Sequence, residues 1–195
     1  MQIQKLMVAG ALVAVMALTG CRSTQEVLQI GAAAESNPGP CPRAFALYDA
    51  ERFVEFKGDG RQTFANVGFT GEIGRIRSLC RYYGERPILA DLEIEMDFGR
   101  GPAAEAASNT YQYWVAVTRK NIAVINKQYF PLSVRFPAGT DRVSVLETID
   151  EIVIPRAGEN TSGENFEIIV GFDVNEEQRT FNAEGRRFRV SAGQN

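Results

Sequence analysis

Apolar and polar residues alternate with a period of two along most of the chain after Cys41, and helical periodicity is scarce. The clearest case is the segment 88–98, in which apolar residues alternate with Asp and Glu. This pattern predicts a strand with one face buried and the other in solvent. Similar runs, separated by turns rich in Gly, Pro and Asn, predict further strands at 52–57, 64–69, 73–83, 111–118, 122–129, 132–136, 143–147, 151–154, 165–174 and 187–190.

Many short strands separated by turns predict an all-β fold. We expect an antiparallel β-sandwich formed by residues 41–195 as a single domain, and the immunoglobulin-like sandwich is the first architecture to consider. The segments 99–110 and 161–164 are expected to be exposed loops. The predicted core residues are Ile76, Leu92, Ile94, Met96, Phe98, Tyr113, Val115, Val117, Val124, Phe166, Ile168, Val170 and Phe172.

The pattern also predicts the pairing of two hairpins. In the first, 73–83 pairs with 89–98, and residues of opposite charge face each other in a ladder on the solvent side. The predicted pairs are Arg81 with Asp91, Arg77 with Glu95, Arg75 with Asp97 and, on the buried side, Cys80 with Leu92 and Ile76 with Met96. Because a straight strand spreads the carboxylates of Asp91, Glu93, Glu95 and Asp97 over about 20 Å, the ladder is favoured over a calcium site.

The second predicted hairpin turns at Arg119-Lys120. Val115 would face Val124, and Trp114 would face Ile125. Both strands would then be apolar on both faces, which is typical of central strands. The aromatic residues of this region could form a stacking platform for a sugar or peptide, but aromatic side chains in strands are more typical of a core.

Composition and charge exclude several mechanisms. The chain has 195 residues, a net charge of −3 and no histidine. Ser-His-Asp and Cys-His catalysis both need an imidazole, and most catalytic zinc sites use His ligands, so these mechanisms are excluded. The mixed charges lack the basic stripe that a phosphate backbone requires, so nucleic acid is not an expected partner. We expect no cofactor and no metal site.

Residues 1–20 have the pattern of a secretory signal peptide. Lys5 is followed by an uncharged, mostly apolar run from Met7 to Leu18. A helix of that length spans about 18 Å, which is too short for a hydrocarbon core of about 30 Å. We therefore expect the segment to be removed rather than to remain as a membrane span.

The residues Leu18-Thr19-Gly20-Cys21 resemble the lipobox of bacterial lipoproteins. The resemblance covers only the N-terminal segment. It implies that the Cys21 thiol is alkylated by a diacylglyceryl group, that the chain is cleaved after Gly20, and that the new amino group of Cys21 is acylated. Because several acyl chains hold a protein far more firmly than one, such an anchor would be permanent. Members kept in the inner membrane usually carry Asp where this chain has Arg22, which implies the outer membrane and a domain facing the periplasm. The alternative is an ordinary signal peptide with Cys21 as a passenger.

Residues 21–40 are expected to form a lipid-anchored flexible tether. They end in Asn37-Pro38-Gly39-Pro40 and show no sustained apolar period. A flexible chain of this length has a root-mean-square reach of roughly 24 Å. That reach would hold the domain close to the bilayer without fixing its orientation.

Lipidation of Cys21 leaves Cys41 and Cys80 as the other two cysteines. Because the periplasm is oxidising, an even remainder predicts a disulfide between them. The alternative is a pair of separate buried thiols. Without histidine, neither thiol is expected to act as a nucleophile.

The sequence contains no recognisable catalytic set, so we expect a non-catalytic interaction or scaffolding module of the cell envelope. Its partners would be the membrane, through the N-terminal lipid, and an envelope protein bound by exposed loops or a sheet edge. One alternative is a carrier or sensor of a small ligand or lipid, with a pocket between the sheets. Another is a hydrolase that uses two converging carboxylates.

Overall fold

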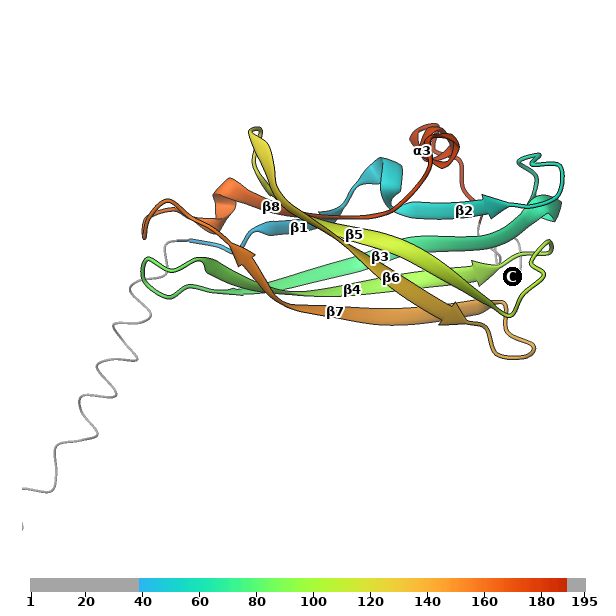
Figure 1. Ribbon diagram of the computed structural model, residues 1–195, viewed down its shortest axis with the longest axis horizontal. Helices are drawn as coiled ribbons and strands as arrows, with labels where there is room; N and C mark the ends of the chain where they lie inside the picture. The colour runs from blue at the N-terminus through green and yellow to red at the C-terminus, as the bar shows by residue number, and fades with distance from the viewer. Residues whose placement is uncertain (1–38, 189–195) are drawn as a thin grey trace, which may run out of the picture. The chain divides into compact units, whose positions relative to one another are not determined.

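The structure is a computed structural model that describes residues 39–188. Eight strands form two four-stranded sheets, which we call sheet A (order β1-β8-β5-β6) and sheet B (order β2-β3-β4-β7; Figure 1). The strands are β1 (Arg43–Ala46), β2 (Arg52–Phe56), β3 (Val67–Arg81), β4 (Ile88–Arg100), β5 (Ser108–Arg119), β6 (Ala123–Arg135), β7 (Arg142–Ile154) and β8 (Phe166–Phe172). The helical elements are η1 (Tyr48–Ala50), η2 (Phe64–Asn66), η3 (Gly163–Asn165) and the α-helix α3 (Glu176–Ala183).

The two sheets pack face to face, so the predicted all-β sandwich is confirmed. All pairings are antiparallel except that of β1 with β8. The immunoglobulin-like architecture is not confirmed. The consecutive strands β2, β3 and β4 form a meander within one sheet, whereas an immunoglobulin domain places its third strand in the opposite sheet from the second.

The core lies between the inner faces of the sheets. The alternating strand β4 contributes Leu92, Ile94, Met96 and Phe98, which are each at most 1% exposed. Most of the predicted core is confirmed; Ile76 is only partly buried against it. The prediction that Val124 belongs to the core is wrong, because this residue is 62% exposed.

Several predicted strands join into longer ones, and two elements were not predicted. The segments 122–129 and 132–136 belong to the single strand β6, and 143–147 and 151–154 belong to β7. β1 and α3 were missed because each is short. The predicted strand 187–190 lies partly outside the described residues, and its first two residues are not in a strand.

The first hairpin forms with a different register. Near the turn, Arg77 pairs with Glu93 and Ile76 with Ile94, two residues away from the prediction. A bulge between Ile73 and Ile76 then changes the register further along. The hydrophobic pattern is unchanged by a shift of two residues, so it could not decide between these registers.

The charge ladder is nevertheless present on the outer face of sheet B. Arg81 contacts Asp91 at 3.0 Å and Arg77 contacts Glu95 at 3.6 Å, as diagonal pairs. The predicted pair of Arg75 with Asp97 is wrong. Arg75 lies 3.7 Å from Glu95, and Asp97 lies 3.3 Å from Arg142 on the neighbouring strand β7.

The second hairpin differs more strongly from the prediction. Val115 faces Gln128 and Trp114 faces Tyr129, four residues beyond the predicted partners. The turn is a three-residue loop, 120–122, in which Asn121 has a φ of 57°. Loops of this length commonly place one residue in the left-handed region. β5 is central and buried, as predicted, but β6 lies at the edge of sheet A.

The predicted long loop 99–110 is shorter in the structure. β4 continues to Arg100 and β5 begins at Ser108. Ala104 packs against the core, so the segment is not fully exposed. Gly101 approaches β3 so closely that a Cβ atom would lie 2.2 Å from the carbonyl oxygen of Val67. The segment 161–164 is a loop only as far as Ser162, because η3 begins at Gly163. It is not fully exposed, since Gly163 is buried.

The predicted disulfide joins Cys41 to Cys80, with their Cα atoms 5.6 Å apart. Beside it, the Tyr82 hydroxyl donates to the Pro40 carbonyl and accepts from the Gly163 backbone N–H, both at 2.8 Å. The start of the domain is thereby attached to both sheets. No helix among residues 39–188 is long and apolar enough to cross a membrane.

The signal segment 1–20, the lipidation site Cys21 and the tether 21–40, up to residue 38, lie outside the described residues. Their assignments therefore stay predictions.

Candidate functional site

The four edges of the two sheets differ in how they are protected. An unprotected edge strand exposes backbone N–H and C=O groups to which another chain can pair. β1 and β6 are the edges of sheet A, and β2 and β7 are the edges of sheet B. β1 has only four residues, and a short edge offers little to a partner.

The edge strand β2 is covered by α3. The helix begins with a capping box, in which the Asn175 side chain accepts from the Gln178 backbone and the Gln178 side chain accepts from the Asn175 backbone. The Gln178 side chain also donates to the Val54 carbonyl at 2.6 Å. Asn182 donates to the carbonyls of Asp49 and Arg52 at 2.9 and 2.8 Å. Amide side chains of the helix therefore occupy the acceptors that a neighbouring strand would use.

The edge strand β7 is interrupted by a bulge. Between its pairs with Leu92 and Ala90, β7 contains one additional residue, and Glu151 has a φ of 58°. The Asp91 carboxylate accepts from the Glu151 backbone N–H at 3.1 Å. A bulge bends an edge strand and interrupts its ladder; β7 pairs regularly with β4 only from Arg142 to Ile149, before the bulge.

β6 also contains a bulge, in which Ile125 is the additional residue between its pairs with Thr118 and Val117. This bulge lies next to the turn, and a regular ladder with β5 continues from Asn126 to Arg135, in which Pro131 is the one residue without a backbone N–H.

The edge strand β6 has 13 residues and pairs only with β5 among the described strands. Every residue from 123 to 129 is exposed. Figure 1 shows the β5–β6 turn projecting from the body of the sandwich. Exposed apolar side chains follow this turn, with Ile122 at 69% and Val124 at 62% exposure. We call this strand the β6 edge.

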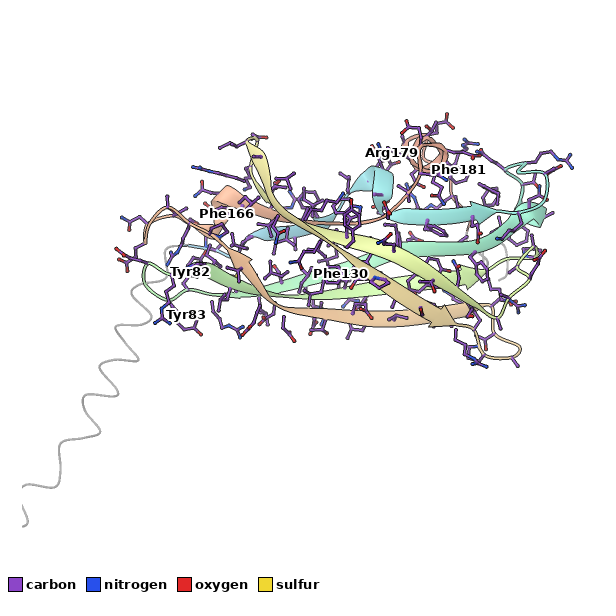
Figure 2. The ribbon with its side chains drawn as sticks, viewed as in Figure 1. Tyr82, Tyr83, Phe130, Phe166, Arg179 and Phe181 are labelled. Carbon is purple, nitrogen blue, oxygen red and sulfur yellow. A yellow bond between two sulfur atoms is a disulfide. The ribbon has the colours of Figure 1, made fainter. Side chains whose placement is uncertain are left out.

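An apolar groove lies between the β6 edge and β7, where the two sheets separate. It has a volume of about 240 Å³. Its walls combine buried strand positions of β5 with side chains of the two edge strands. The lining residues are Val115, Val117, Asn126, Gln128, Phe130, Ile149, Asp150, Ile152 and Val153. We call it the β6–β7 groove; its Phe130 is labelled in Figure 2.

The register explains why amides line an otherwise apolar groove. Asn126 pairs with Val117 and Gln128 pairs with Val115, so both amides lie on the inner side of β6. Inner positions of a sandwich are normally apolar. Polar residues there indicate that this part of the sandwich interior is open to water or to a polar partner.

One polar contact joins the sheets within this opening. The Tyr113 hydroxyl donates to Glu147 of β7 at 3.2 Å. Burial raises the pKa of Tyr113, and the Glu147 charge adds to the shift. The ring of Tyr113 stacks on Phe130, with centroids 5.2 Å apart. These contacts fix the floor of the groove next to its open part.

The outer side of the β6 edge carries a lysine between two aromatic rings. The Lys127 ammonium nitrogen lies 4.1 Å from the centroid of the Trp114 ring and 4.9 Å from that of Tyr129. Trp114 is buried and Tyr129 is about half exposed. Cation–π attraction holds the charge over the outer face of sheet A rather than across the strand edge. Trp114 therefore belongs mainly to the packing and not to an open aromatic platform.

Two other hollows are less suited to a partner. A space of about 40 Å³ beneath the C-terminal segment is lined by charged groups that form ion pairs, such as Arg187 with Glu72 at 3.7 Å. A wider opening of about 520 Å³ near Phe53 and Asn109 is lined mostly by polar side chains. Neither lies along the β6 edge.

The sequence-predicted sites are distributed as follows. Cys41 and Cys80 form the disulfide, and Cys21 lies outside the described residues. No group of three or more Cys, Asp or Glu side chains within residues 39–188 is arranged to hold a metal ion. The β6 edge and its groove were not predicted, because the pattern placed β6 in the centre of a sheet. The available signal was the run of three consecutive polar residues, Asn126, Lys127 and Gln128, because such a run places polar side chains on both faces of a strand.

Comparisons of this chain with models of protein families, with curated proteins and with solved structures found no match.

Proposed function

We propose that the protein is a lipoprotein anchored in the outer membrane, facing the periplasm, and that its β-sandwich is a non-catalytic interaction module of the cell envelope. The observation that carries the interaction role is the β6 edge, a 13-residue strand that, among the strands of residues 39–188, pairs with β5 alone and carries exposed apolar side chains. Added strands bind through main-chain hydrogen bonds and gain specificity from pockets for alternate side chains. The β6–β7 groove supplies such a pocket along the same strand.

The proposed anchor rests on the lipobox-like residues that end at Cys21. The Cys41–Cys80 disulfide supports it, because such bonds persist in oxidising compartments such as the periplasm. Cell fractionation of the Cys21→Ser variant tests the anchor. We expect the variant to leave the membrane fraction, and retention there would contradict lipid anchoring.

Site-specific photo-crosslinking in intact cells tests the interaction role. The photoreactive residue benzoylphenylalanine is placed at position 124 on the β6 edge and, as a control, at position 93 on the exposed side of the central strand β4. We expect protein adducts from position 124 and none above background from position 93. Equal yields from the two positions would contradict the assignment of the β6 edge as the docking site.

The groove also favours a second candidate function, a carrier of a small apolar ligand or lipid. Ligand sites combine apolar walls with a few polar groups that fix orientation, and the groove is lined by six apolar residues together with Asn126, Gln128 and Asp150. Native mass spectrometry of the Cys21→Ser protein, purified without detergent, tests this role. A copurifying lipid that is lost on substitution of Ile149 by Asp would support the carrier role over the interaction module.

A further inference from the structure

Charge is unevenly distributed along the hairpin that contains the β6 edge. Residues 106–140 include four basic residues, Arg119, Lys120, Lys127 and Arg135, and no Asp or Glu, although the whole chain is net −3. All four basic residues are exposed. The hairpin is therefore a basic element on an acidic protein.

These four basic side chains are not neutralised by any carboxylate of residues 39–188. Among the described residues, no ion pair joins any of them to a carboxylate. The outer face of sheet B is different, because its arginines pair with acids of the neighbouring strands. Unpaired charge beside an exposed apolar strand favours an occupant of opposite charge.

The geometry of the edge defines what each side of an added strand would meet. Side chains of a strand alternate between the two faces of a sheet. On the inner side, the added strand would meet Ile149, Ile152 and Phe130. Asp150 and the amides of β6 line the same groove, so apolar or uncharged polar side chains suit this side and acidic ones do not. On the outer side, it would lie next to Ile125, Lys127 and Tyr129, where the positive charge is held.

We propose that the occupant of the β6 edge is an extended segment of another protein in which apolar and acidic residues alternate. Its apolar side chains fill the β6–β7 groove, and its carboxylates lie on the outer face beside Lys127. Beyond the turn, Arg119 and Lys120 extend the same positive charge. This inference rests on the proposed interaction role and specifies the chemistry of the partner.

An anionic lipid surface has the same charge as this segment but fits the site less well. A flat bilayer can reach the outer face of sheet A but cannot enter a groove between two strand edges. It also offers no regular row of backbone groups to pair with β6. The inner amides of Asn126 and Gln128 suit a peptide backbone or polar side chain within hydrogen-bonding reach.

The test combines the photo-crosslink at position 124 with charge reversal in the full chain. Lys120→Glu and Lys127→Glu are compared with Arg179→Glu, which makes the same charge change on α3, away from the β6 edge (Figure 2). We expect each of the two hairpin variants to lower the adduct yield about tenfold, and Arg179→Glu to leave it unchanged. Lys120 lies in the turn, so its variant separates the charge effect from any loss of packing around Lys127.

Mass spectrometry of the crosslinked peptide gives the second readout. We expect a segment with alternating apolar and acidic residues. A synthetic peptide of that segment should bind in solution, and its counterpart with Asn and Gln in place of Asp and Glu should bind about tenfold more weakly.

The outcomes separate the two proposals. Protein adducts that are insensitive to both charge reversals, or that contain no acidic segment, would overturn the acidic partner and leave the interaction module standing. Adducts with lipid in place of protein, or no adduct above the position 93 control, would overturn both.

Discussion

The absence of a side chain at Gly171 leaves room for the indole ring of Trp114. The indole of Trp114 lies against β8 and donates to the Phe172 carbonyl at 3.1 Å. A Cβ atom at Gly171 would lie 2.5 Å from that ring and 2.8 Å from the Cβ of Ala50. Both neighbours are buried, so neither can move away freely. Trp114 in turn supports Lys127 on the outer side of the β6 edge.

The Gly171→Ala variant is expected to lose about 1–3 kcal/mol of unfolding free energy, because the added methyl overpacks this contact. Urea denaturation at neutral pH measures the loss. Gly158→Ala is the control, since no atom lies within 4 Å of a Cβ at that position. Similar losses in the two variants would show that the close packing around Trp114 is not the cause.

Tyr113 makes stability sensitive to alkaline pH. Its pKa is raised from 10.0 by burial and by Glu147. The folded state therefore holds the phenol proton more tightly than the unfolded state, so the stabilisation is complete below pH 10 and is lost as pH rises further. At pH 7 the Tyr113→Phe variant should have an unfolding free energy about 1 kcal/mol lower, because it lacks the hydrogen bond to Glu147. Above pH 10 its unfolding free energy should decline less steeply than that of the unaltered protein. Urea unfolding at both pH values measures this, and parallel declines would contradict it.

At the scale of elements, α3 shows how a short helix protects a sheet edge. Asn182 is 1% exposed, and its side chain donates to two carbonyls beside β2. Because Asn182 is buried, its removal would leave these two carbonyl oxygens without their hydrogen-bond donor. The loss of unfolding free energy should therefore exceed that of one ordinary hydrogen bond.

The Asn182→Ala variant should therefore lose about 2–3 kcal/mol of unfolding free energy, measured by urea denaturation. It should also weaken the protection of β2 amides in hydrogen exchange before that of β4 amides. The exposed Asn160→Ala is the control and should change stability little. Uniform loss of protection across both strands would argue against a local role for the helix.

Strands were predicted correctly where their pattern of apolar and polar residues allows only one face to be buried. In β4, every second residue is apolar, so strand, face and burial were predicted correctly from residues such as Leu92 and Ile94. In β6, the run of Ala123, Val124 and Ile125 fits several registers, and the register is instead set by the three-residue turn. The candidate site lies on the element whose register the pattern could not select.

α3 was missed for a different reason. It has eight residues, which are too few for helical periodicity to be recognised, because that periodicity is read over windows of about 11–18 residues. Its start signal was present in Asn175 and Gln178, which form the capping box. Glu176 and Glu177 lie in the first turn of this helix, where negative charge is favourable.

At the scale of the whole molecule, the two outer faces of the sandwich differ in chemistry. Sheet B presents a ladder of paired charges, which contributes little to stability and keeps that face solvated. Sheet A ends in the apolar and basic β6 edge. The outer face of sheet B also exposes Leu79 and Leu146 beside its paired charges, so the two faces differ in whether their charges are paired and not in apolar exposure alone.

The disulfide joins the two sheets at one end of the molecule. Cys41 precedes β1 of sheet A, and Cys80 lies near the end of β3 in sheet B. The bond closes a separation of 39 residues, so its removal should lower the unfolding free energy by about 4 kcal/mol in the chain-entropy account.

Urea denaturation of the variant carrying both Cys41→Ala and Cys80→Ala checks this value. The unaltered protein under a strong reductant should behave in the same way. If neither treatment lowers the urea midpoint of unfolding, the disulfide does not stabilise the domain by constraining its unfolded chain.

The same bond determines which strand bears the load when the protein is pulled from the N-terminal side. Tension arriving at residue 41 passes through the sulfur atoms to β3, which is held between β2 and β4. The four-residue ladder of β1 is bypassed, so it is not peeled away first. Force applied at residue 41 would therefore enter the domain through a 15-residue strand that is hydrogen-bonded on both sides.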